Sequence, residues 1–150
     1  MAAVGGIRVP LQVSRQCVIA SVQVDLTPEV TEALESDVLE LIQESRATGL
    51  IIDLSGVELL EPEEFTALRR VMTMARLMGA HPVVSGFRPG VVSALMDLDV
   101  DVVGIEATRS TDDAIELISA SLDLAETSTK PKRSAINDLD RDEADDPDPI

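Results

Sequence analysis

The sequence predicts an α/β domain, with a mixed, largely parallel sheet of about four or five strands and about four helices. Short apolar runs alternate along the chain with segments whose apolar residues recur at helical spacing. Strands that are separated by helices favour parallel pairing. Hydrophobic residues make up 45% of the 150 residues and aromatic residues only 1%, so we expect a single core of aliphatic side chains.

The first half of the chain predicts a hairpin, a helix and a central strand. Residues 9–13 and 17–24 are expected to pair across a tight turn, because both are apolar and the segment between them is short and polar. Residues 27–29, Thr-Pro-Glu, begin a helix, since they supply a capping side chain, a proline for the first turn and an acid for the helix dipole. Gly49 is expected to end that helix. The nearly all-apolar run at residues 50–54 predicts a central strand that is covered on both faces or flanked by parallel neighbours.

The second half repeats the alternation of helix and strand. We expect a helix at residues 61–78, a strand at residues 82–85 and a short helix from Pro89. Residues 102–103 predict a weak last strand, and residues 111–113 supply the cap of a final helix. The expected order of elements is therefore β-β-α-β-α-β-α-β-α.

Charge and composition divide the chain into two regions. Residues 1–125 form the expected domain, whereas residues 126–150 are rich in acids and proline and predict a disordered acidic tail. The whole chain has 28 acidic and 12 basic residues, for a net charge of −16. Neither a run long enough to cross a membrane nor a secretory signal is recognised in the sequence, and the lone Cys17 suits a reducing compartment. These features predict a cytoplasmic protein without membrane contact.

The composition also excludes several functions. Nucleic-acid binding is not expected, because it needs clustered Lys and Arg or aromatic stacking platforms. A single Cys and a single His, His81, exclude an internal disulfide and a metal site built from several Cys and His ligands. The sequence also lacks glycine-rich phosphate loops and any spacing typical of a nucleophile and its base. No enzyme activity, cofactor or metal is therefore expected.

Two acidic features are candidate sites. Asp53 ends an expected parallel strand at the edge where α/β sheets place their sites, so it either binds a metal or phosphate or orders its own loop. The second expected helix opens with Glu61, Pro62, Glu63 and Glu64. These acids either only complement the positive helix terminus or present an acidic surface to a partner.

Three segments resemble a known family. Residues 51–61 (IIDLSGVELLE) are similar to the strand-loop-helix signature of STAS domains, the anti-sigma-factor antagonist family. Residues 71–80 (VMTMARLMGA) and 83–92 (VVSGFRPGVV) resemble the stressosome subset of that family, and most of all its single-domain RsbS type. The resemblance covers residues 7–122.

The resemblance implies a non-enzymatic scaffold. Proteins of this type pack with RsbR-type STAS paralogues into a large cytoplasmic shell, which holds a switch serine/threonine kinase of the RsbT type until phosphorylation releases it. The implied partners are therefore STAS subunits, in a homo- or hetero-oligomer, and this kinase, in a partner-switching pathway of stress signalling. The partner-binding residues expected here are Asp53, Glu58, Glu61, Pro62, Glu63 and Glu64.

The sequence departs from the family where phosphate is expected. Pro62 stands in place of the serine or threonine that accepts phosphate at the start of the second helix, and Ala94 stands at the second acceptor position, so neither is expected to be modified. Thr66 and Ser93 lie nearby and carry hydroxyl groups, but neither aligns with an acceptor. The acids at this helix start either mimic a permanent phosphate, which weakens kinase binding, or bind a different partner constitutively.

Two other functions stay open. An anti-anti-sigma factor would bind an anti-sigma kinase directly, in a small complex rather than a large shell. A small-ligand-binding protein or metal-dependent enzyme would use Asp53 and the N-terminus of the second helix, although the crowded acids there disfavour an anionic ligand. The segments at residues 77–80 and 88–89 favour the scaffold over the direct antagonist.

Overall fold

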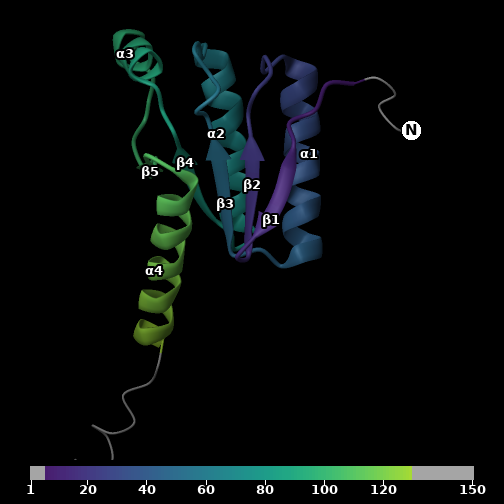
Figure 1. The fold of residues 1–150 in the computed structure, drawn as a ribbon, viewed down its shortest axis with the longest axis vertical. Helices are drawn as coiled ribbons and strands as arrows, with labels where there is room; N and C mark the ends of the chain where they lie inside the picture. Colours follow the sequence, from purple (N-terminus) through teal and green to yellow (C-terminus); the bar gives the residue numbers. More distant parts are fainter. Residues whose placement is uncertain (1–5, 130–150) are drawn as a thin grey trace, which may run out of the picture. The chain divides into compact units, whose positions relative to one another are not determined.

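A computed structural model describes residues 6–129 of the chain. Over these residues a five-stranded sheet is combined with four helices (Figure 1). The strands lie in the order β1-β2-β3-β4-β5; β1 and β2 are antiparallel, and the other neighbours are parallel. This mixed, largely parallel sheet confirms the predicted α/β class. The elements are β1 Leu11–Ser14, β2 Cys17–Ser21, α1 Pro28–Ser45, β3 Gly49–Asp53, α2 Pro62–Leu77, β4 His81–Ser85, α3 Pro89–Asp97, β5 Ala107–Thr108 and α4 Thr111–Thr129.

β1 and β2 form the predicted hairpin. Ser14 pairs with Cys17, which leaves Arg15 and Gln16 as the turn. Both turn residues have left-handed backbone angles, with φ of 49° and 64°. Two such residues give the turn the twist that matches a pair of antiparallel strands. β2 ends at Ser21, so it is shorter than predicted, and the rest of the predicted strand is loop.

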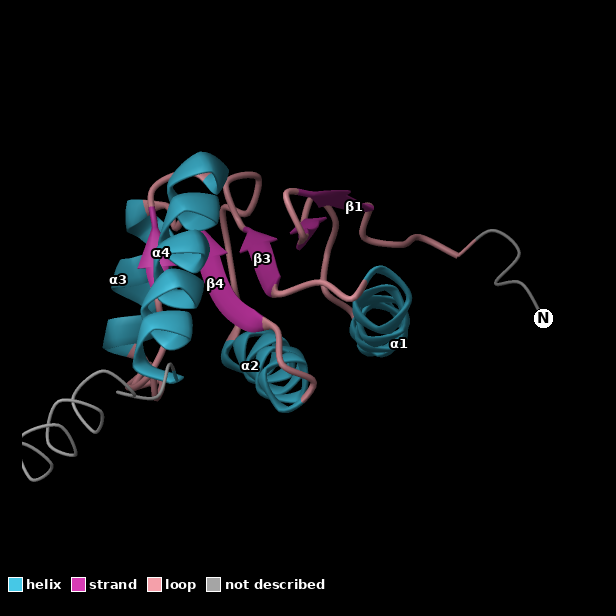
Figure 2. Ribbon diagram, turned by 90° about the horizontal axis from the view of Figure 1, so that it is seen from below, coloured by secondary structure: helices cyan, strands magenta, loops and turns pink. Residues whose placement is uncertain are grey.

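Strands β2, β3 and β4 are buried on both faces, as predicted for residues 50–54, whereas the edge strands β1 and β5 are partly exposed. α1 and α2 lie on one face (Figure 2), and alternate side chains of the parallel strands point toward them because successive residues of a strand face opposite ways. The sheet residues in this core include Val18, Ala20, Leu50, Ile52 and Val84. The buried residues on the other face are Cys17, Ile19, Ile51 and Val83 of the sheet and Ala114, Ile115 and Ile118 of α4.

Gly49 has a packing role, and the prediction that it ends α1 is wrong. α1 is closed by Arg46, which has a left-handed φ of 54° and donates its N–H to the carbonyl of Ile42. Gly49 begins β3, where an added Cβ would lie 2.7 Å from Ile118 Cδ1 and 2.9 Å from Cys17 Sγ. The missing side chain therefore lets Ile118 pack directly on the sheet. Burial raises the pKa of the Cys17 thiol, which fits a cysteine that acts as a packed hydrophobic residue.

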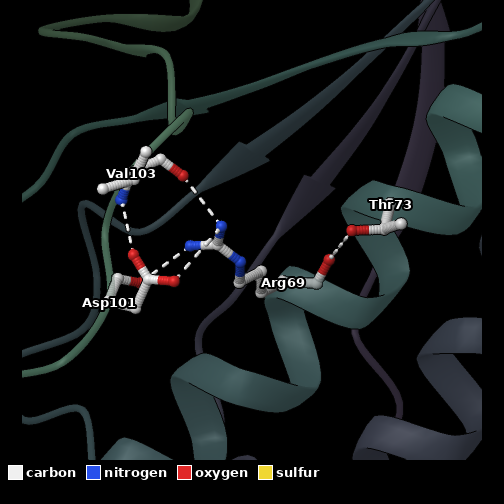
Figure 3. Close-up of polar contacts among 4 residues, drawn as sticks. All are labelled: Arg69, Thr73, Asp101 and Val103. Carbon is white, nitrogen blue, oxygen red and sulfur yellow. Dashed lines mark hydrogen bonds and ion pairs between the residues drawn. The ribbon is translucent and has the colours of Figure 1, made fainter.

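The predicted strand at residues 102–103 is wrong. The last strand is β5, Ala107–Thr108, and the segment before it is a loop that Arg69 holds against α2 (Figure 3). The Arg69 guanidinium donates to the carbonyl of Asp101 at 2.7 Å and to the carbonyl of Val103 at 2.8 Å. The Val103 N–H donates to the Asp101 carboxylate at 3.0 Å. These bonds occupy backbone groups that a strand would offer to a neighbouring strand.

The chain divides into two compact units after Ser119, which lies within α4. The described residues of the second unit are the last turns of this helix, which continues past the predicted domain boundary at residue 125. The rest of the predicted acidic tail, residues 130–150, lies outside the described residues. Within the described range, no helix combines the length and the apolar character that crossing a membrane requires.

Candidate partner-binding site

Two helices begin at the carboxyl ends of neighbouring strands. Ser21, the last residue of β2, pairs with Asp53, the last residue of β3. Each strand leads through a loop into a helix that starts with proline, Pro28 in α1 and Pro62 in α2. Proline suits this position because the N–H that it lacks has no partner inside the helix. The parallel pairing of β2 and β3 therefore brings two helix N-termini to one edge of the sheet.

A groove of about 980 Å³ lies between these two helix starts. One side consists of the β2–α1 loop and the start of α1, and the other of the β3–α2 loop and the start of α2. The lining residues are 23–28, 31, 56–61, 63, 64 and 67. Leu26 and Leu60 line it and are buried, whereas Asp25, Glu61 and Glu63 line it and are exposed. The groove thus combines apolar buried side chains with an acidic rim.

Glu64 holds the two sides of the groove together. Its Oε1 accepts from the Glu61 backbone N–H at 2.8 Å, and its Oε2 accepts from the Leu26 backbone N–H at 3.1 Å. The first bond satisfies an N–H at the start of α2, as in half of a capping box. The second bond ties α2 to the β2–α1 loop. Each of the two carboxylate oxygens of Glu64 therefore accepts a backbone N–H within the fold.

The other acids at the start of α2 face solvent. Glu61 and Glu63 are exposed, and Leu59, which precedes them in the β3–α2 loop, is 70% exposed. Glu58 is exposed as well and lies 3.4 Å from the Arg88 guanidinium. A surface ion pair of this kind contributes little to stability. Glu58, Glu61 and Glu63 thus line the same groove as the exposed Leu59.

Asp53 does not line the groove. Its Oδ1 accepts from the Ser55 backbone N–H at 2.9 Å, so it orders the start of the β3–α2 loop. Arg88, the residue that caps α3, donates from Nε to the Ser55 carbonyl at 2.8 Å. Gly86 lets its loop approach Ser55 closely, because a Cβ added at Gly86 would lie 2.9 Å from Ser55 Cβ. The φ of Gly86, 77°, also favours glycine at this position. Throughout residues 6–129, moreover, His, Cys, Asp and Glu form no group of three that could hold a metal ion.

The hydroxyl groups considered as alternative phosphate acceptors lie on two different helices. Thr66, in α2, donates its hydroxyl to the Pro62 carbonyl at 2.9 Å. Ser93 is exposed on α3, and Ala94 beside it is partly buried. Neither hydroxyl belongs to a residue that lines the groove.

Sequence reasoning missed the α1 side of the groove. Asp25 and Leu26 lie in the β2–α1 loop. Leu26 precedes Glu64 by 38 residues in the sequence, so only the fold brings this loop next to α2. A signal for Asp25 was present, because it follows a predicted strand just before a Thr-Pro helix start, and neighbouring parallel strands end at the same edge. The acidic rim therefore has two sides rather than one.

Solved structures share this arrangement of strands and helices, although no protein-family model and no curated protein matches the sequence. RsbS of Moorella thermoacetica, in a serine-to-glutamate variant, has a TM-score of 0.66 and 19% identity, covering 76% of this chain and 97% of that one. A chain from the stressosome, which is described as a signal integration and transduction hub, has a TM-score of 0.66 and 18% identity, covering 75% and 98%. A Thermotoga maritima protein described as an anti-sigma factor antagonist has a TM-score of 0.61 and 14% identity, covering 74% and 94%.

The chain has the STAS fold. This confirms, at the level of fold, the resemblance seen in residues 51–61, 71–80 and 83–92. In this fold the first of the three segments forms β3 and the loop that leads to α2. The acidic rim is thus built around the strand-loop-helix signature of the fold.

Proposed function

We propose that this STAS domain is a non-enzymatic scaffold and regulatory subunit of the stressosome type. It binds STAS paralogues and an RsbT-type switch kinase in the cytoplasm. The fold that it shares with RsbS and with a stressosome chain, over nearly the whole length of both, supports the scaffold role. The acidic rim supports the groove as the kinase-binding surface.

The observation that carries the proposal is the make-up of the α2 start. Pro62 is the first residue of the helix, and the exposed Glu61 and Glu63 stand on either side of it. Leu59 lies at the same groove and is 70% exposed. An apolar side chain bordered by carboxylates suits a partner that presents an apolar anchor flanked by Lys or Arg. We therefore expect the docking surface of the kinase to be basic.

Pro62 makes this surface insensitive to phosphorylation at the acceptor position of the family. Proline has no hydroxyl group, whereas a phosphate there would add a charge of about −1.5 to −2. Glu61 and Glu63 supply exposed, permanent negative charge at this position, whereas the oxygens of Glu64 are already bound to backbone N–H groups. We infer that the affinity of the kinase for this chain is the same before and after the kinase has used ATP.

Phosphate mapping tests the proposal. The full chain is incubated with a purified RsbT-type kinase and ATP, and the modified sites are located by mass spectrometry. A serine-bearing RsbS protein in the same reaction is the positive control. We expect phosphate on the control and none on this chain. Stoichiometric phosphate on Thr66 or Ser93 would overturn the non-switchable surface.

A second candidate function is an anti-anti-sigma factor that binds an anti-sigma kinase directly. The similarity to the Thermotoga maritima protein, at a TM-score of 0.61, favours this candidate. The size of the complex in solution separates the two. A scaffold forms a large assembly with an RsbR-type paralogue, whereas a direct antagonist forms a small complex with one kinase. Size-exclusion chromatography with light scattering measures the difference.

A further inference from the structure

The loops at the amino ends of β2, β3 and β4 lie side by side, at the edge of the sheet opposite to the groove and at the lower end of these strands in Figure 1. They are the β1–β2 turn, the α1–β3 loop and the α2–β4 loop, residues 15–16, 46–48 and 78–80. The Thr48 N–H donates to the Gln16 carbonyl at 2.8 Å, and the His81 N–H donates to the Thr48 carbonyl at 2.9 Å. These backbone bonds join the three loops into one surface, and none of the loops contains an acidic residue.

Three arginines and two apolar residues are exposed on this surface. Arg15 lies in the β1–β2 turn, Arg46 closes α1, and Arg76 lies in the last turn of α2. Leu77 and Met78 directly follow Arg76 and are 84% and 42% exposed. We call these five residues the basic edge. In a chain with 28 acidic and 12 basic residues, such a gathering of arginines is a local departure from the overall charge.

The fold does not use these arginines in ion pairs. Within residues 6–129, Arg15, Arg46 and Arg76 have no carboxylate within ion-pair distance, whereas four other arginines do: Arg8, Arg69, Arg70 and Arg88. A cation near the C-terminus of a helix complements the helix dipole, which accounts for Arg46 and Arg76. It does not account for Arg15, which follows a strand.

The local backbone does not favour arginine at two of these positions. Arg15 and Arg46 have left-handed φ values of 49° and 54°, a conformation that favours glycine or asparagine. A two-residue hairpin turn of this kind prefers Asn-Gly, and a helix end of this kind prefers glycine. Side chains that are held in an unfavourable backbone conformation are typical of functional surfaces. The backbone therefore gives no reason for arginine at either position, whereas a partner that binds the two side chains would.

We propose that the basic edge is a docking surface for an acidic segment of a partner protein. Such a segment brings Asp or Glu to the arginines and an apolar side chain to Leu77 and Met78. Guanidinium groups bind carboxylates through two parallel N–H donors, and the apolar contact removes exposed surface from water. None of the five residues lines the groove. The inference therefore goes beyond the proposed function, because the groove suits a basic partner and the basic edge an acidic one.

Fluorescence anisotropy of a labelled peptide tests the basic edge in the full chain. The probe is a short synthetic peptide of Glu residues with one Leu at its centre. We expect binding at about 0.05 M NaCl that is mostly lost at about 0.5 M, because salt screens the charges. The double variant Arg15→Asn and Arg46→Gly should raise the Kd for the probe at least about fivefold. Replacing Leu by Ser in the probe should also raise the Kd.

Urea unfolding of the same double variant separates binding from a role in the fold. The urea midpoint should stay equal to that of the wild-type chain or rise, because Asn and Gly suit a left-handed φ better than Arg does. A lower midpoint would show that the two arginines serve the fold and would contradict the inference.

The matched control is Arg8→Gln with Arg109→Gln, which removes two charges from exposed residues outside the basic edge and should leave the Kd unchanged. A full chain that does not bind the probe would contradict the acidic segment as the occupant. So would equal losses of affinity in the control and in the double variant. A chain that binds the probe as expected but binds no kinase would contradict the proposed function and leave this inference standing.

Discussion

The groove between α1 and α2 and the outer side of α3 both expose apolar side chains, but they differ in the number of acids beside them. Asp25, Glu61 and Glu63 border the groove near the exposed Leu59. On α3 the exposed Val92 and Met96 share their helix with a single acid, Asp97. Acidic borders favour a basic partner, and such binding weakens when salt screens the charges. The comparison teaches that the placement of its acids, rather than exposed apolar area alone, distinguishes the surface of this domain that suits a basic partner.

The largest expected effect comes from reversing the charges of the groove. The double variant Glu61→Lys and Glu63→Lys should weaken binding of an RsbT-type kinase at least about tenfold, or about 1.4 kcal/mol. The same variant should stay folded, because both residues are exposed. Isothermal titration calorimetry measures the first effect, and circular dichroism measures the second.

Glu40→Lys with Glu44→Lys is the matched control for net charge. Both residues are exposed near the C-terminal end of α1 and do not line the groove. The control changes the total charge by the same amount, so it should reproduce any general effect of charge on kinase binding. If it weakens binding as much as the groove variant does, the groove is not the kinase-binding surface.

A smaller effect separates two neighbouring acids of the groove. Glu64→Gln should lower the free energy of unfolding by about 1 kcal/mol, because the two backbone N–H groups bind different oxygens and the amide replaces one of these oxygens with an NH2 group, which cannot accept. Glu63→Gln should leave stability nearly unchanged and weaken kinase binding instead, because Glu63 is exposed. Urea unfolding of the two variants checks the difference. Equal loss of stability in both would contradict the role of Glu64 as a link between α2 and the β2–α1 loop.

Most of the fold could be predicted from the sequence because its signals are local. Apolar runs predicted the strands, and the Thr-Pro-Glu start of α1 and the prolines of α2 and α3 predicted the helix starts. The failures depend on contacts between distant segments. Residues 102–103 are apolar enough for a strand, but the Arg69 guanidinium binds the backbone carbonyls of Asp101 and Val103 and holds the segment as a loop. Glycine is a residue type that commonly ends helices. Gly49 instead lies in β3, where the absence of a side chain lets Ile118 pack on the sheet.

The candidate site was predicted in part. The acids at the start of α2 are recognisable from the sequence, since they follow a strand and a loop. The separate roles of Glu63 and Glu64 are not, because they depend on the position of the Leu26 backbone N–H. The α1 side of the groove, with Asp25, depends on the pairing of β2 with β3. Spacing alone places residues on a helix or strand but does not show which backbone groups lie opposite them.

The most direct test of the central claim compares the wild-type chain with Pro62→Ser. The affinity of each for an RsbT-type kinase is measured before and after incubation of the pair with ATP. We expect the affinity of the wild-type chain to stay constant, because Pro62 cannot accept phosphate, and the affinity of Pro62→Ser to change severalfold as its new hydroxyl is modified. An ATP-dependent change of the same size in the wild-type chain would contradict the account.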